Sequence, residues 1–122
     1  MASTHPFFSP RTHGFVRVGA ATPVVHLADP AANAEEHVRL IARAADEGCD
    51  LVVFPELSLS AYAIDDLHMQ AALLEEVERR LPDLAAATAE TGVVAVVGAP
   101  VRHRDRLYNC AVVLGNGEVL GV

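Results

Sequence analysis

Short, largely apolar runs bounded by turn-forming residues are the first pattern in the chain. Three of them are residues 51–54, 93–97 and 107–114, and a shorter stretch surrounds Arg17 at residues 15–18. Continuous runs of this length are typical of β-strands that are covered on both faces. The tripeptide Gly-Asn-Gly at 115–117 is characteristic of a tight turn, so residues 118–122 are expected to return as the second arm of a hairpin. The sequence therefore predicts five strands.

An amphipathic helix is predicted between the first two strands. It should begin at Asp29-Pro30, because an aspartate accepts hydrogen bonds from the free N–H groups of a first turn and a proline there loses no needed donor. Gly48 should end it. Its apolar face would be formed by residues that recur at helical intervals, namely Ala34, Val38, Ile41 and Ala45.

A second helical pattern precedes the third strand. We expect Asp65 and Asp66 to cap it. The apolar positions that follow have helical spacing: Leu67, Ala71, Leu74, Val77 and Leu81. Pro82 has no backbone N–H, so the helix should break there and a further helix should reach Glu90 or Thr91.

The order of these elements predicts the fold class. Alternation of strands and helices in the first half implies crossover connections, whereas closely spaced strands at the end imply antiparallel pairing. We therefore expect an α/β protein with a mixed sheet. A last strand that runs to Val122 would be an uncovered edge, so we expect that the chain is cut short.

Composition and charge narrow the class of partner. With 122 residues, 52% of them apolar and 20% charged, the chain should form at most one globular domain. All nine basic residues are Arg and the net charge is −7, which argues against nucleic acid as a partner. The two cysteines are too few for a disulfide framework and lack metal-site spacing, so no metal is expected. Without a signal-like start or an apolar segment of bilayer length, we expect a cytoplasmic protein that does not use a membrane.

Glu56 is the sharpest candidate for chemistry. It follows the apolar run 51–54 after a single proline, at the carboxyl end of an expected buried strand, where ligands collect in open α/β sheets. A carboxylate held there can accept and return a proton. An acid after a strand is more often a solvated loop residue or a helix cap, so the position alone does not establish catalysis.

The surroundings of Glu56 resemble the nitrilase, or carbon–nitrogen hydrolase, superfamily. The resemblance is carried by Phe54-Pro55-Glu56-Leu57, Ser60-Ala61-Tyr62 and Asp65-Asp66-Leu67. It implies an αββα sandwich, of which this chain would be the N-terminal portion, and a Glu–Lys–Cys triad whose glutamate is Glu56. In such a triad the glutamate takes the thiol proton, the thiolate attacks an amide carbonyl, and the lysine helps to hold the oxyanion.

A closer resemblance, spread from Phe7 onward, is to glutamine-dependent NAD synthetases. Separated motifs in one order carry it: Phe7-Phe8-Ser9-Pro10, His13-Gly14-Phe15-Val16-Arg17-Val18, Asp29-Pro30 with Asn33, the motif at 54–57, Gly98-Ala99-Pro100, and residues 106–112. The resemblance implies that residues 1–13 are a lead-in and that residues 14–122 are a glutaminase domain truncated at its C-terminal end. It also implies a missing synthetase domain, which uses ATP and magnesium to convert deamido-NAD to NAD with ammonia from glutamine, and a homo-oligomeric parent.

The chain departs from that family in the remainder of the triad. It contains no Lys, and Cys49 and Cys110 lie where the family shows no nucleophile. We therefore expect the chain alone to be inactive, with Glu56 as its catalytic residue. Two alternatives stay open: a piece of a stand-alone amidase of the same superfamily, or a non-catalytic interaction fragment.

Other polar residues carry weaker expectations. Tyr62 could bind glutamine, or it could pack in its loop with the hydroxyl in water. Asn109 is better explained as structural support, and so is His13. Asp65 and Asp66 are expected to be a helix cap and not a metal pair, because no other ligand is spaced to join them.

Overall fold

The fold is built on one five-stranded sheet. In the computed structural model, which describes residues 5–122, the strands lie side by side in chain order: β1 (Val18–Ala20), β2 (Leu51–Val53), β3 (Val94–His103), β4 (Arg106–Gly115) and β5 (Glu118–Gly121). β1, β2 and β3 are parallel to one another, whereas β3, β4 and β5 are antiparallel. The predicted α/β class and the mixed sheet are confirmed.

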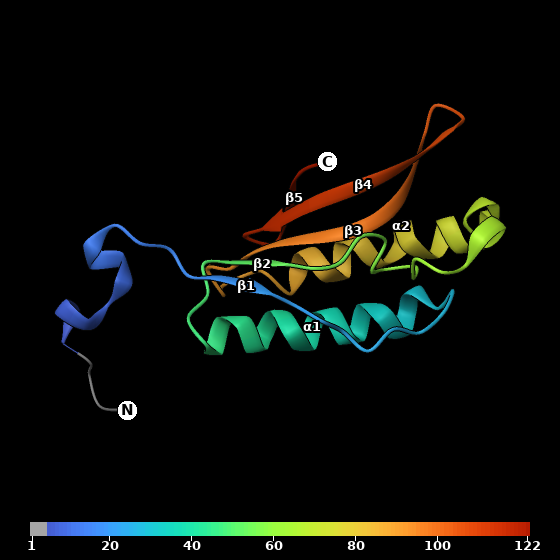
Figure 1. The fold of residues 1–122 in the computed structure, drawn as a ribbon. Coiled ribbons are helices and arrows are strands. Elements are labelled where there is room, and N and C mark those ends of the chain that lie inside the picture. Colours follow the sequence, from blue (N-terminus) through green and yellow to red (C-terminus); the bar gives the residue numbers. More distant parts are fainter. Residues whose placement is uncertain (1–4) are drawn as a thin grey trace.

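Two α-helices lie on one side of the sheet (Figure 1). They are α1 (Pro30–Asp46), between β1 and β2 in the chain, and α2 (Ala71–Ala86), between β2 and β3. Two 3₁₀-helices, η1 (Pro6–Phe8) and η2 (Pro10–His13), form an N-terminal arm that extends away from the sheet (Figure 1). Large side chains that are completely buried form the core: Ile41, Val77, Leu84, Val97, Val112 and Leu114. Each such burial stabilises the fold by about 1.5–3 kcal/mol.

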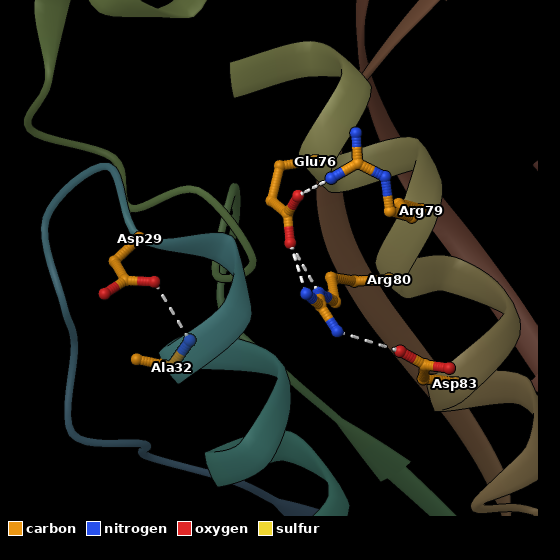
Figure 2. Close-up of polar contacts among 6 residues, drawn as sticks. All are labelled: Asp29, Ala32, Glu76, Arg79, Arg80 and Asp83. Atoms are coloured by element: carbon orange, nitrogen blue, oxygen red, sulfur yellow. Dashed lines mark hydrogen bonds and ion pairs between the residues drawn. The ribbon is translucent and has the colours of Figure 1, made fainter. Parts of the chain in front are cut away.

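Helix α1 begins where the sequence predicts. The Asp29 carboxylate accepts a hydrogen bond from the Ala32 N–H at 3.0 Å (Figure 2). This bond satisfies one of the free donors of the first turn, and Pro30 occupies the first helical position without losing a bond. Gly48 follows the helix end in the left-handed conformation, with φ +72°.

The buried face of α1 differs from the predicted one. Ala34 and Ile41 are buried as expected, but Val38 is 38% exposed. Asn33 and His37, four residues apart, are buried instead, because their polar groups find hydrogen-bond partners in neighbouring loops. A pattern of apolar positions cannot anticipate polar residues that are buried together with their partners.

The predicted cap of the second helix is wrong. Asp65 and Asp66 lie in a separate 3₁₀-helix, η3 (Asp65–Met69), and the extended residue Gln70 separates it from α2. Gln70 is the N-cap of α2, and its side chain makes no capping bond. Backbone hydrogen bonds in this segment join residues three apart, as in a 3₁₀-helix. One example runs from the Gln70 N–H to the Leu67 carbonyl at 3.0 Å, so the 3₁₀-helix ends before α2 begins.

Pro82 does not break helix α2, contrary to the prediction. The helix continues through this residue to Ala86. A proline in a helix removes one N–H donor. Val77 and Leu84 are fully buried on either side of it, so both halves of the helix are anchored to the same core.

A series of ion pairs runs along α2, with Glu76, Arg80 and Asp83 on the side of the helix that faces α1 (Figure 2). Glu76 contacts both Arg79 and Arg80, and Arg80 also contacts Asp83 at 3.3 Å. Exposed helix pairs of this kind contribute about 0.3–0.5 kcal/mol each. The Arg80–Asp83 pair spans Pro82 and favours the continuous helix.

The final strands pair antiparallel as expected; β3 and β4 are longer than predicted, whereas β5 ends one residue before the predicted Val122. The strand expected at 93–97 extends to His103, which pairs with Arg106 at the end of the β3–β4 ladder. In the turn before β5, Asn116 and Gly117 have φ values of +53° and +82°, as the predicted tight turn requires.

The sheet face opposite the helices is open. Val18 and Val53 are 59% and 40% exposed, whereas Val52, which points to the helix side, is 3% exposed. Both helices lie on the other side (Figure 1). Within the described residues, strand 51–53 is therefore covered on its helix side alone.

Candidate functional site

Glu56 lies in a tight turn at the carboxyl end of β2. The Phe54 N–H donates to the Val96 carbonyl at 2.9 Å, which continues the pairing with β3. The chain then leaves the sheet at Pro55, and the Ser58 N–H donates back to the Pro55 carbonyl at 3.1 Å. We call residues 55–58 the acid-bearing turn. It puts Glu56 at the rim of the sheet with an exposed side chain.

The acid-bearing turn rests directly on the backbone of β3 at Gly98. A Cβ atom at this position would lie 2.3 Å from the Pro55 carbonyl oxygen and 2.4 Å from the Leu57 nitrogen. The Gly98 carbonyl also accepts a hydrogen bond from the Leu59 N–H at 3.0 Å. Only glycine leaves room for this approach, so Gly98 sets the distance between the turn and the sheet.

Leu57, the neighbour of Glu56, has a left-handed backbone with φ +52°. This conformation costs a leucine about 1–2 kcal/mol. Its side chain is only 8% exposed, and burial of a leucine offsets that cost by about 1.5–3 kcal/mol. Strained residues held by their surroundings are often found at functional turns.

Asn109 on β4 holds the Glu56 carboxylate. Its Nδ2 donates a hydrogen bond to Glu56 Oε1 at 2.5 Å. In the β3–β4 ladder Asn109 pairs with Pro100, two residues from Gly98, so it projects from the same face of the sheet as the turn. The sequence predicts structural support from Asn109, and in the structure its amide lies at the candidate carboxylate.

Glu56 and Asn109 border a shallow depression of about 260 Å³. It is lined by Val53, Phe54, Pro55, Glu56, Val96, Gly98, Asn109, Cys110 and Ala111. Most of this wall is apolar. A carboxylate that is oriented by a neutral amide beside an apolar wall is suited to take up and return a proton.

A buried histidine lies behind the acid-bearing turn. The ring of His37 stacks on the ring of Phe54, with 4.2 Å between centroids and 20° between planes. Its Nδ1 lies 2.6 Å from the Asn33 carbonyl oxygen, and its Nε2 lies 2.8 Å from the Ser58 hydroxyl. Burial lowers the pKa of His37, against the smaller opposing effects of the Asn33 carbonyl and Glu36, so the ring is neutral near pH 7. The sequence pattern did not single out this residue.

Tyr62 and His13 lie away from the depression. Tyr62 is 67% exposed and is not among the lining residues. His13 belongs to the N-terminal arm, where its Nε2 lies 2.7 Å from the Phe7 carbonyl oxygen. This contact agrees with a structural role for His13, whereas glutamine binding by Tyr62 stays a prediction.

The two cysteines are free thiols on the core side of the sheet. Cys49 is 8% exposed. Cys110 packs against the hydrophobic core and pairs in the ladder with the fully buried Ala99. Since neighbouring strand residues point to opposite faces, the Cys110 thiol points away from Asn109 and the Glu56 carboxylate.

Neither a metal centre nor a bilayer-crossing helix is found in residues 5–122. No group of three or more His, Cys, Asp or Glu side chains in this span is arranged to hold a metal ion. None of its helices combines the length and apolarity needed to cross a membrane.

The most similar known proteins include enzymes of NAD synthesis. The chain is 50% identical over 116 residues to the glutamine-dependent NAD(+) synthetase of Mycobacterium tuberculosis (strain ATCC 25618 / H37Rv). The match covers 95% of this chain but 17% of that protein, so the chain spans only a small part of the relative's length.

Solved structures of two kinds of enzyme share the fold. The glutamine-dependent NAD+ synthetase of Acinetobacter baumannii, solved with ADP, has a TM-score of 0.79 and 26% identity, over 87% of this chain and 20% of that one. An amidase from Nesterenkonia sp. has a TM-score of 0.71 and 23% identity, over 87% of this chain and 41% of that one, which shows the fold alone. The family model for carbon–nitrogen hydrolases matches residues 16–122, nearly the whole chain. This chain belongs to the carbon–nitrogen hydrolase family.

Proposed function

We propose that the chain is the N-terminal part of the glutamine-hydrolysing domain of a glutamine-dependent NAD synthetase. The identity of 50% over 95% of the chain carries this proposal. The family model begins at residue 16, whereas a match of 116 residues must include part of the chain before that residue. The similarity to the synthetase therefore extends over more of the chain than the similarity to the family model does. In this proposal residues 1–13 are a lead-in, and residues 14–122 are part of the glutaminase domain.

Glu56 is the general base and general acid of the proposed reaction. It takes the proton of a cysteine thiol, and the thiolate attacks the side-chain amide carbon of glutamine. The protonated carboxyl then gives that proton to the departing ammonia. Water, deprotonated by the same carboxylate, hydrolyses the thioester, and the proton returns to the thiolate. Asn109 supports this role because its amide orients one carboxylate oxygen at 2.5 Å.

The cysteine and the lysine of the triad would come from the rest of the parent protein. The chain contains no Lys, and Cys110 points away from the Glu56 carboxylate. We therefore propose that this chain alone does not hydrolyse glutamine. Tyr62, exposed in the loop after the acid-bearing turn, would contact glutamine once the rest of the domain closes the depression.

The remaining substrates belong to the part of the parent outside this chain. There the released ammonia would convert deamido-NAD to NAD with ATP and magnesium. We also propose that the parent is a cytoplasmic homo-oligomer, in line with the resemblance. In line with the resemblance, we place the ATP and magnesium in that part of the parent and none in this segment.

A stand-alone amidase is the second candidate function. It is favoured by the shared fold of the Nesterenkonia amidase, of which the chain covers 41%. The sequence of the gene after the codon for Val122 distinguishes the two. An ATP-binding region after the hydrolase domain supports the synthetase, and a stop codon directly after that domain supports the amidase.

Glu56→Gln in the full-length protein tests the proposed role directly. The substitution keeps the size and the hydrogen bond from Asn109 but removes the ability to move a proton. General acid–base catalysis contributes about 10²–10⁴-fold, so ammonia release from glutamine should fall by at least about 100-fold. The matched control is Glu35→Gln, at an exposed position of α1, which should keep the wild-type rate. An unchanged rate for Glu56→Gln would overturn the proposal.

A further inference from the structure

We propose that His37 is a positioning residue, which fixes the Glu56 carboxylate by holding the acid-bearing turn from behind at Ser58. This inference rests on the proton-transfer role proposed for Glu56. It assigns a task to a buried titratable group that the proposed reaction itself does not use.

The hydrogen bonds define which nitrogen of His37 carries the proton. The Asn33 carbonyl oxygen can only accept, so Nδ1, at 2.6 Å, must be the donor. The buried ring is neutral, so Nε2 has a free lone pair and accepts from the Ser58 hydroxyl at 2.8 Å. From outside α1, Ser58 and Phe54 contact the ring, and neither is charged; Glu36 is the nearby charge on α1 itself.

One ring contacts both ends of the segment that carries Glu56. Phe54, two residues before Glu56, stacks on His37, and Ser58, two residues after Glu56, donates to it. Ser58 is itself buried, at 4% exposed, which shields its hydroxyl from bulk solvent. The segment 54–58 is contacted at both ends by one ring, which leaves its central residue, Glu56, little freedom to move.

Asn33, one helical turn before His37, adds a second hydrogen bond between α1 and the chain near Glu56. Its Nδ2 donates to the carbonyl of Leu59, the residue after Ser58, at 3.1 Å. Asn33 and His37 are 1% and 0% exposed, and residues four apart lie on the same helix face. Helix α1 therefore presents two buried polar groups to two successive residues, Ser58 at the end of the turn and Leu59 directly after it.

The held turn faces Gly98 on its other side, where the backbone of β3 leaves no spare space. The Glu56 carboxylate is thus located by three elements: α1 through His37, β3 through Gly98, and β4 through Asn109. A displacement of about 1 Å in a catalytic group can cost about 10²-fold in rate. Loss of the His37–Ser58 bond should therefore appear in kcat and not only in stability.

Ser58→Ala in the full-length protein tests this, with Thr88→Val as the matched control. Thr88 is also fully buried, and its hydroxyl donates to the Ala85 carbonyl at 2.7 Å and accepts from the Gly117 N–H at 3.1 Å, next to the β4–β5 hairpin. Both substitutions remove a buried hydroxyl. We expect Ser58→Ala to lower kcat for glutamine hydrolysis by about 10- to 100-fold with little change in KM, and Thr88→Val to leave kcat unchanged.

A second variant, His37→Phe, keeps the stacked ring and removes both hydrogen bonds. It should lose at least as much kcat as Ser58→Ala, and the double variant should lose no more than His37→Phe alone, because both substitutions remove the same His37–Ser58 bond. The inference is contradicted if Ser58→Ala keeps kcat, if Thr88→Val lowers kcat equally, or if the two losses multiply. Should His37→Phe fail to fold, the comparison of Ser58→Ala with Thr88→Val still decides.

Glu56→Gln in the same assays separates the two proposals. If it hydrolyses glutamine normally, the role of Glu56 fails and the positioning role fails with it. If Glu56→Gln is inactive while Ser58→Ala has the wild-type kcat, the positioning role of His37 alone is refuted.

Discussion

The amide nitrogen of Asn109 lies 2.5 Å from Oε1 of Glu56, although the two residues are 53 positions apart in the chain. The contact joins the end of a parallel strand to an antiparallel hairpin. The contact exists because β3 pairs with both β2 and β4. Strand β3 runs parallel to β2 and antiparallel to β4. The mixed character of the sheet thus brings an amide donor to the carboxylate at its rim.

Loss of the Asn109 amide should impair glutamine hydrolysis in the full-length protein. A hydrogen bond to a charged group contributes about 1.5–3 kcal/mol, so Asn109→Ala should lower kcat by about 10- to 100-fold. Asn109→Asp has the same size but places a second carboxylate beside Glu56, and repulsion should make it the worse variant. Steady-state kinetics with glutamine check this. Wild-type kcat in Asn109→Asp would show that the contact has no role in the reaction.

Gly98→Ala should displace the acid-bearing turn. The added Cβ would lie 2.3 Å from the Pro55 carbonyl oxygen, so the turn has to move away from β3. Glutamine hydrolysis should be lost, and the domain should melt at a lower temperature. The control is Gly121→Ala on β5, where a Cβ meets nothing within 4 Å. Equal activity of the two variants would show that the close approach at Gly98 does not matter.

The stability of this region should depend on pH through His37. Burial lowers the pKa of this ring from its ordinary value of 6.5, so the unfolded chain takes up a proton at a higher pH than the folded chain does. The stability contributed by the neutral ring is therefore complete above pH 6.5 and is lost as the pH falls toward the folded pKa.

Calorimetry of the full-length protein between about pH 7 and pH 5 measures this effect. The melting temperature of this domain should fall more steeply in the wild type than in His37→Phe, which has no imidazole to protonate. Parallel curves for the two proteins would contradict the assignment of a neutral, buried His37.

Pro82→Ala should stabilise helix α2. Pro82 is exposed, and the helix passes through it to Ala86, so alanine can restore one backbone hydrogen bond without disturbing the core. The expected gain is about 1–3 kcal/mol, because proline in a helix interior costs about 3 kcal/mol relative to alanine. A higher melting temperature at unchanged glutaminase activity is the expected result. An unchanged or lower one would mean that the proline is accommodated without cost.

The sequence predicted correctly those features that depend on interactions between residues close together in the chain. Asp29-Pro30 begins α1 through a bond to a residue three positions away, and Gly-Asn-Gly at 115–117 makes its turn from its own backbone preferences. Pro82 shows the limit of such signals. Its local effect is unfavourable, but the buried Val77 and Leu84 on either side outweigh it.

The candidate site depends on contacts that are distant in sequence. Glu56 could be proposed from its place after an apolar run and from the motif around it. Its contact with Asn109 depends on the register of β3 against β4, which no local pattern encodes. His37 was not predicted for a different reason. Its side chain is polar and was therefore not expected in the core, yet the hydrogen bonds to Asn33 and Ser58 allow it to be buried.

The use of two nitrogen sources by the full-length protein tests the role of Glu56 most directly. NAD formation should be measured with glutamine and, separately, with free ammonia, for the wild type, Glu56→Gln and the control Glu35→Gln. We predict that Glu56→Gln loses synthesis from glutamine and keeps synthesis from ammonia, while Glu35→Gln keeps both. Equal loss with both nitrogen sources, or normal synthesis from glutamine, would contradict the account.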